Sequence, residues 1–295
     1  MKNQMLIVMV VVCAVFGGAT YGQRLPANVD AHRDVEYGRA GDHTLKLDLY
    51  LPKDVEHPPL LVWIHGGGWR AGDKRGCRLS FMLAEGYAVA SINYRLTDVA
   101  SFPAQIHDCK GAIRWLRAHA KAYGYNADRI GIGGSSAGGH LVALLGTSHN
   151  DQALEGDIGG NADKSSAVQA VLDLYGPTDL ISIYEQSDNP HHRQKDSPIT
   201  KLLGGTIQQK PDAAKAASPA SHITADDPPH LILHGGQDPL VPVQQSIDYD
   251  AALRQAGVES TLIVLPDERH GGRGFFDAER RMAIKAFYDR HIRQK

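Results

Sequence analysis

The chain has 295 residues, of which 42% are hydrophobic and 22% are charged, a balance typical of a globular protein close to the size at which chains divide into several domains. Its formal net charge is -2 at pH 7, and it contains no basic run, so electrostatics provide no reason to expect nucleic acid as a partner. The 15 histidines show no metal-ligand spacing, and the adjacent pair at 191–192 is interpreted as a solvated loop, so no metal site is predicted.

The amino terminus differs in composition from the rest of the chain. Lys2 precedes an apolar run over residues 5–16, which then gives way to small residues. This order is typical of a secretory signal peptide, and the run falls short of the ~20 residues that a membrane anchor needs. We predict a signal peptide over 1–22, cleaved after Gly22. It would export a 23–295 domain to the periplasm or the medium, with no membrane association after cleavage.

Two kinds of strand pattern follow. Residues 43–52 place leucine at every second position, as in a half-buried strand, and are expected to pair with 34–38 in an antiparallel hairpin. Later apolar runs are continuous, which predicts strands buried on both faces. These runs are 59–64, 87–94, 129–133, 167–175, 230–234 and 260–265.

Helical patterns separate these strands. Residues 103–124 and 242–257 each begin with proline and end with glycine, and a last helix is expected over 277–292. Strict alternation of strand and helix predicts an α/β fold, with a mainly parallel twisted sheet and helices on both faces. Residues 177–229 break the alternation and are rich in Pro, Asp, Ser and Gln. We interpret them as a small lid insertion rather than a plain surface excursion.

Two cysteines remain after the predicted cleavage, Cys77 and Cys109. The expected fold puts their helices on opposite faces of the sheet, so we expect partly buried thiols rather than a disulfide.

The stretch 134-GSSAG-138 fits the G-x-S-x-G pattern with Ser136 at its centre. It follows the strand ending near Gly133 and precedes an apolar helical run, the context in which this pattern forms a sharp turn that exposes a nucleophilic serine. Glycines are needed there because side chains would collide. The alternative is an ordinary glycine-rich turn. Ser135 precedes the central position and is predicted to point away from the site.

A second glycine-rich stretch, 65-HGGGW-69, comes directly after the strand 59–64. Acyl transfer passes through an intermediate with a negatively charged oxygen, which needs backbone N–H donors aimed at one point. Three successive glycines after the first buried parallel strand favour such an oxyanion loop over a flexible turn.

A serine needs a base, and the base needs an orienting carboxylate. Asp238 follows the strand 230–234 and His270 follows the strand 260–265, so both are predicted at the carboxyl ends of parallel strands, where open α/β sheets place their sites. His234 is expected to shape the loop before Asp238. The rival carboxylates, Asp173, Asp179, Asp267 and Glu268, are ranked lower.

Together these motifs resemble the α/β-hydrolase carboxylesterases of the HGGG, hormone-sensitive-lipase-like group, and most of all its bacterial feruloyl-esterase-like (BD-FAE-like) branch. The resemblance rests on 65-HGGGW-69, 91-SINYRL-96, 133-GGSSAGGH-140, 231-LILHGGQDPLVP-242 and 270-HGG-272. It implies an oxyanion hole formed by Gly67, Gly68 and the N–H of Ala137. The chain departs from the group at Ser135, where aspartate is usual, and in its short 23–42 segment, which cannot build a long cap. Both departures point away from long-chain lipids.

The sequence therefore predicts a secreted serine carboxylic ester hydrolase with the triad Ser136, His270 and Asp238 and with no cofactor. Small or carbohydrate-linked esters of feruloyl or acetyl type are the expected substrates. A serine peptidase of the same fold is the alternative within this chemistry, and a non-catalytic binding module on the same fold is the alternative outside it. The particular ester and the oligomeric state stay open.

Overall fold

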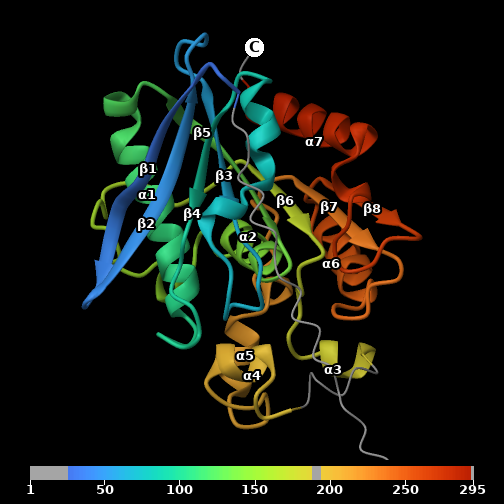
Figure 1. The fold of residues 1–295 in the computed structure, drawn as a ribbon. Helices are drawn as coiled ribbons and strands as arrows, with labels where there is room; N and C mark the ends of the chain where they lie inside the picture. The colour runs from blue at the N-terminus through green and yellow to red at the C-terminus, as the bar shows by residue number, and fades with distance from the viewer. Residues whose placement is uncertain (1–25, 188–193, 294–295) are drawn as a thin grey trace, which may run out of the picture.

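The computed structural model describes residues 26–187 and 194–293. One eight-stranded sheet forms its centre (Figure 1). The strands are β1 (Val29–Ala40), β2 (His43–Pro52), β3 (Pro59–Ile64), β4 (Ala88–Ile92), β5 (Asn126–Ser135), β6 (Ala170–Leu174), β7 (His230–Gly235) and β8 (Ser260–Leu265).

The sheet order is β1-β2-β4-β3-β5-β6-β7-β8. The pairs β1·β2 and β2·β4 are antiparallel, and every later pair is parallel. The predicted hairpin is confirmed, although β1 begins at Val29 rather than at residue 34. Because the parallel strands share one direction, their carboxyl ends and the loops that follow meet at one end of the molecule.

Helices cover both faces of the sheet, as the alternation predicts (Figure 1). The α-helices are α1 (Ala104–Tyr123), α2 (Ala137–Thr147), α3 (Ile183–Gln186), α4 (Pro198–Leu203), α5 (Pro211–Ala216), α6 (Gln244–Gln255) and α7 (Ala278–His291). The 3-10 helices are η1 (Lys74–Gly76), η2 (Arg78–Leu83), η3 (Gln152–Leu154), η5 (Pro219–Ser221) and η6 (Gly274–Phe276).

The strand residues alternate between two large core clusters. On β3, Val62 packs in the cluster that contains residues of α1 and α2, whereas Trp63 packs in the cluster that contains residues of η2 and α7. Cys109 lies in the first cluster and Cys77 in the second, so the predicted absence of a disulfide is confirmed. The expectation of partial burial is wrong, because both cysteine side chains are fully buried.

β8 was expected to be buried on both faces, but Val264 is 40% exposed, because β8 is the last strand of the sheet and the helices cover it only in part. The segment 177–229 contains α3, α4, α5 and η5, and α4 and α5 lie beyond one end of the sheet (Figure 1). Residues 188–193 of this insertion fall outside the described residues.

The predicted signal peptide over 1–22 also lies outside the described residues. Within residues 26–187 and 194–293, no helix combines the length and the apolar character that crossing a bilayer requires.

Candidate active site

Ser136 occupies the sharp turn between β5 and α2. Its backbone has φ 54° and ψ -119°, a conformation that a residue with a side chain adopts only when its surroundings enforce it. A Cβ at Gly134 would lie 2.3 Å from the carbonyl oxygen of Gly138, and one at Gly138 would lie 2.1 Å from the oxygen of Ile64. The two glycines are therefore required by close backbone contacts. The strained turn exposes Ser136 at the carboxyl end of β5.

The imidazole of His270 lies between Ser136 and Asp238. Its Nε2 is 2.8 Å from Ser136 Oγ, and its Nδ1 is 2.7 Å from Asp238 Oδ2. Since a carboxylate only accepts hydrogen bonds, Nδ1–H donates to Asp238, and Nε2 is left to accept from the Ser136 hydroxyl. The geometry thus presents a base directed at the serine proton.

Asp238 is held as an anion inside the protein. The side chain is fully buried, and the backbone N–H groups of Leu240 and Val241 donate to its Oδ1 at 2.8 and 3.0 Å. Burial alone would raise the pKa of Asp238, but hydrogen bonds from His234 and His270 outweigh it and hold this pKa well below its usual range. Asp238 therefore stays charged across the neutral pH range.

His234 organises the loop that carries Asp238, as the sequence predicts. Its Nε2 is 2.9 Å from the carbonyl oxygen of Val241 and 3.2 Å from Asp238 Oδ2. Its Nδ1 lies 2.6 Å from the hydroxyl of Ser246 on α6. The sequence did not indicate this contact between His234 and Asp238, which adds to the hydrogen bond that Asp238 receives from His270.

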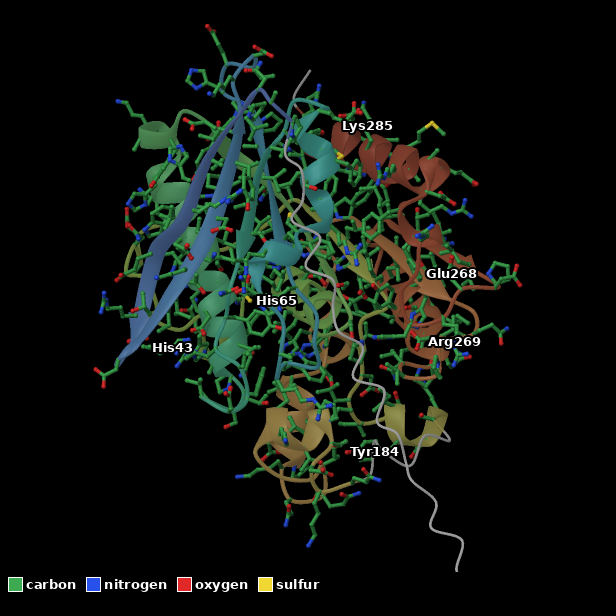
Figure 2. All side chains as sticks on the ribbon, viewed as in Figure 1. His43, His65, Tyr184, Glu268, Arg269 and Lys285 are labelled. Atoms are coloured by element: carbon green, nitrogen blue, oxygen red, sulfur yellow. The ribbon has the colours of Figure 1, made fainter. Side chains whose placement is uncertain are left out.

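The rival carboxylates are engaged elsewhere or exposed. Glu268 accepts from the backbone N–H of Gly274 at 2.9 Å, and Asp179 accepts from that of Ile181 at 2.9 Å. Asp267 is exposed. Figure 2 labels the two residues that follow it, Glu268 and Arg269. Asp173 is fully buried on β6, where burial raises its pKa to about 6.

The glycine-rich stretch forms a tight loop after β3, with His65 at its start (Figure 2). Gly67 has φ 115° and Gly68 has φ 60°, a region that favours glycine. Within the described part of the chain, their N–H groups donate to no protein acceptor. The N–H of Ala137 begins α2, where the helix leaves amide donors unsatisfied. These three residues line the same cavity as Ser136.

Sequence reasoning missed a buried connection between this loop and the insertion. The indole Nε1 of Trp69 donates to His140 Nδ1 at 3.2 Å, and His140 Nε2–H donates to the carbonyl oxygen of Ala217 at 2.6 Å. Burial lowers the pKa of His140 to about 4, so the ring stays neutral and keeps both bonds. The adjacency of His140 to 134–139 was the one available signal.

Ser135 does not simply point away, as was expected, because it lines the cavity together with Ser136. Its hydroxyl interacts with the side chain of Tyr175. The Tyr175 ring in turn stands edge-on to His270, with ring centroids 4.8 Å apart. Ser135 belongs to the surroundings of the histidine, since it contacts a neighbour of that ring.

The cavity above Ser136 has a volume of about 900 Å³. One wall consists of the loops that follow the strands, and the other comes from the insertion, through residues such as Ile183, Pro198 and Ile199. This volume accommodates a small ester or a sugar-sized ligand.

The chain is similar in sequence to a known family and to several curated esterases. The BD-FAE family matches residues 47–253, a range that contains Ser136 and Asp238 and ends before His270. The chain is 36% identical to the esterase LipQ of Mycobacterium tuberculosis over 244 residues, covering 80% of this chain and 56% of LipQ. It is also 36% identical to the probable carboxylic ester hydrolase LipM of the same organism, covering 80% of this chain and 54% of LipM. The chain thus spans about half the length of these curated relatives.

A solved structure is similar over nearly the whole domain. It is a truncated form of a carbohydrate esterase from gut microbiota, with a TM-score of 0.80 and 32% identity, covering 88% of this chain and 95% of that one. The fold is the one that the strand order predicts.

Proposed function

The chain belongs to the BD-FAE family of α/β-hydrolases, and from that premise we propose that it is a carboxylic ester hydrolase that uses Ser136, His270 and Asp238 as a catalytic triad. One observation carries the proposal: the continuous hydrogen-bonded series from Asp238 through His270 to Ser136. Its order along the chain, serine before aspartate before histidine, is that of α/β-hydrolases.

The reaction proceeds in two steps. His270 Nε2 takes the proton of Ser136 as Oγ forms a bond to the ester carbonyl carbon, and the resulting imidazolium then protonates the departing alkoxide as the ester C–O bond breaks. An acyl-enzyme remains. His270 next takes a proton from water, the water oxygen attacks the acyl carbon, and the acid leaves as Ser136 regains its proton. Asp238 stabilises the imidazolium in both steps.

Each step passes through an intermediate whose former carbonyl oxygen is negative. We assign the N–H groups of Gly67, Gly68 and Ala137 to that oxygen. They lie beside Ser136, and two of them have no acceptor within the described residues. Donors that are already oriented stabilise the developing charge without reorganisation, an effect worth about 3 kcal/mol per donor.

The proposed substrates are small or carbohydrate-linked esters, of acetyl or feruloyl type. The likeness to a carbohydrate esterase supports this class. A serine peptidase would need the same groups, but the similar proteins carry esterase names, which favours esters.

A direct test uses purified protein with p-nitrophenyl acetate and with the corresponding p-nitroanilide. Hydrolysis of the ester and little hydrolysis of the anilide support an esterase, and the reverse order supports a peptidase. No hydrolysis of either would support a binding module.

We also propose export through the 1–22 segment, which the order of Lys2 and the apolar run supports. Mass spectrometry of the protein from its native host should find a mature chain beginning near Gln23. An intact Met1 in a cytoplasmic fraction would contradict export.

A further inference from the structure

Arg78 is an exposed arginine on the wall of the Ser136 cavity. It begins η2, and its guanidinium lies 5.9 Å from the centre of the Phe276 ring. Among residues 26–187 and 194–293, no carboxylate forms a salt bridge with it. A guanidinium is charged at every relevant pH and presents a planar set of donors that matches a carboxylate. Arg78 is therefore available to an anion on a bound molecule.

The other charged side chains along the cavity also bear on the binding of an anion. The carboxylate of Asp73 lies 2.7 Å from the Arg75 guanidinium and is neutralised by it. Asp196 lies on the insertion, next to the residues that begin α4, and Arg70 carries an exposed guanidinium near Pro198 on the same side. Among the described residues, Arg78 therefore faces the cavity without a neighbouring carboxylate to offset it, and it attracts an anionic group.

Arg78 lines the same cavity as Tyr175 and His270. Its guanidinium faces Phe276, and the ring of the preceding residue, Phe275, packs 4.7 Å from that of Tyr175. The Tyr175 ring lies 4.8 Å from His270. In ester cleavage the imidazolium gives its proton to the departing alcohol, so that alcohol must lie on the side of His270. The alcohol part of the ester therefore lies toward Arg78 and the acyl part away from it.

We propose that Arg78 binds a carboxylate on the alcohol part of the ester, so that the preferred substrates are small acyl esters of acidic sugars, such as an O-acetylated uronic acid. This inference rests on the proposed ester hydrolysis and adds to it the charge and the chemical class of the alcohol.

The test compares two esters that differ only in that charge: a methyl glucuronide and a methyl glucoside, each with one O-acetyl group at the same position. Acetate release by the purified full chain gives kcat/KM for both. The variant is Arg78→Gln. The matched control is Arg281→Gln, which also removes an exposed guanidinium near this aromatic cluster, 5.2 Å from the Phe81 ring, but from a residue that does not line the cavity.

We expect the unaltered protein to prefer the acidic ester and Arg78→Gln to lower the ratio of the two kcat/KM values by about fivefold, the range of a partly exposed ion pair. Arg281→Gln should leave that ratio unchanged. Added salt should narrow the preference of the unaltered protein, because it screens the attraction. Thermal melting of each variant confirms that it is folded.

Two outcomes would overturn the inference, and they differ from failure of the proposed function. The first outcome is that p-nitrophenyl acetate is hydrolysed but the two sugar esters have equal kcat/KM values. The second is that Arg78→Gln changes both kcat/KM values by the same factor. Either outcome would mean that Arg78 does not bind the carboxylate of the alcohol part. If no ester is hydrolysed at all, the proposed function falls and this inference falls with it.

Discussion

Nε2 of His234 lies 3.2 Å from Oδ2 of Asp238, the same oxygen that receives the hydrogen bond from His270. The carboxylate is thus fixed from two sides before any substrate binds, and its lowered pKa follows from these bonds. Because two imidazoles contact one oxygen of Asp238, we expect catalysis to be sensitive to the loss of its negative charge.

Asp238→Asn should lower kcat by roughly three to four orders of magnitude while the protein stays folded. An amide is neutral and cannot stabilise the imidazolium, and its NH₂ group favours the tautomer of His270 that cannot accept the serine proton. Steady-state rates on p-nitrophenyl acetate measure the loss, and circular dichroism checks the fold. Asp267→Asn, at an exposed carboxylate in the loop that carries His270, serves as the control and should keep its activity. A similar loss in both variants would mean that Asp238 has no special role.

The Trp69–His140 bond should matter to rate more than to substrate binding. His140→Leu removes the acceptor of the indole N–H and the donor to Ala217, so the loop with Gly67 and Gly68 loses its fixed position. We expect kcat to fall by about tenfold, below the loss of an oxyanion donor itself, with KM nearly unchanged. Trp69→Phe should give a similar loss, and the double variant should cost little more than either single change. Fully additive losses would show that the two residues act independently.

Asp173 should make the protein less stable at alkaline than at mildly acidic pH. Its folded-state pKa is raised from 3.8 to about 6 by burial. The folded protein therefore holds this proton where the unfolded chain has lost it, and stability declines as the pH rises from about 4 through about 6. A rise of this size corresponds to about 3 kcal/mol.

Asp173→Asn removes that titration and keeps an oxygen to accept from Gly176 N–H. Urea unfolding at pH 5 and pH 8 should show a smaller difference between the two pH values in Asp173→Asn than in the unaltered protein. An unchanged difference would contradict the assignment.

We expect kcat/KM to be highest for esters with short acyl chains. Each methylene buried in an apolar tunnel contributes about 0.8 kcal/mol, so a deep acyl tunnel would raise kcat/KM severalfold for every two carbons added. The insertion contains polar stretches, which do not suit the lining of such a tunnel. On p-nitrophenyl esters, kcat/KM should peak at acetyl or butyryl and fall by octanoyl. A steady rise through palmitoyl would indicate a hidden apolar tunnel and a lipase.

Local patterns predicted the parallel part of the sheet well. The ranges 59–64 and 260–265 coincide with β3 and β8, because turn residues bound continuous apolar runs there. The start of β1 at Val29 was missed, since its outer half is polar and becomes a strand only by pairing with β2. The exposure of Val264 depends on its place at the sheet edge, which no local pattern records.

The candidate site also contains residues that local patterns predicted and residues that they did not. Ser136, Asp238 and His270 were predicted because each follows a recognisable strand, and the structure brings their side chains together. No local pattern predicted the role of His140, because its partners Trp69 and Ala217 lie 71 and 77 residues away in the chain. The orientation of Ser135 was also misjudged, because its interaction with Tyr175 forms only once β5 and β6 are paired.

The central claim is that Ser136 is the nucleophile. An organophosphorus p-nitrophenyl ester reacts with an activated serine and leaves a stable covalent mark, which peptide mass mapping locates. The label should appear on Ser136 and be lost in Ser136→Ala, and it should form far more slowly in His270→Ala, while Ser135→Ala should still be labelled and keep the greater part of its esterase activity. A label on Ser135, or activity on p-nitrophenyl acetate that survives Ser136→Ala, would contradict the account.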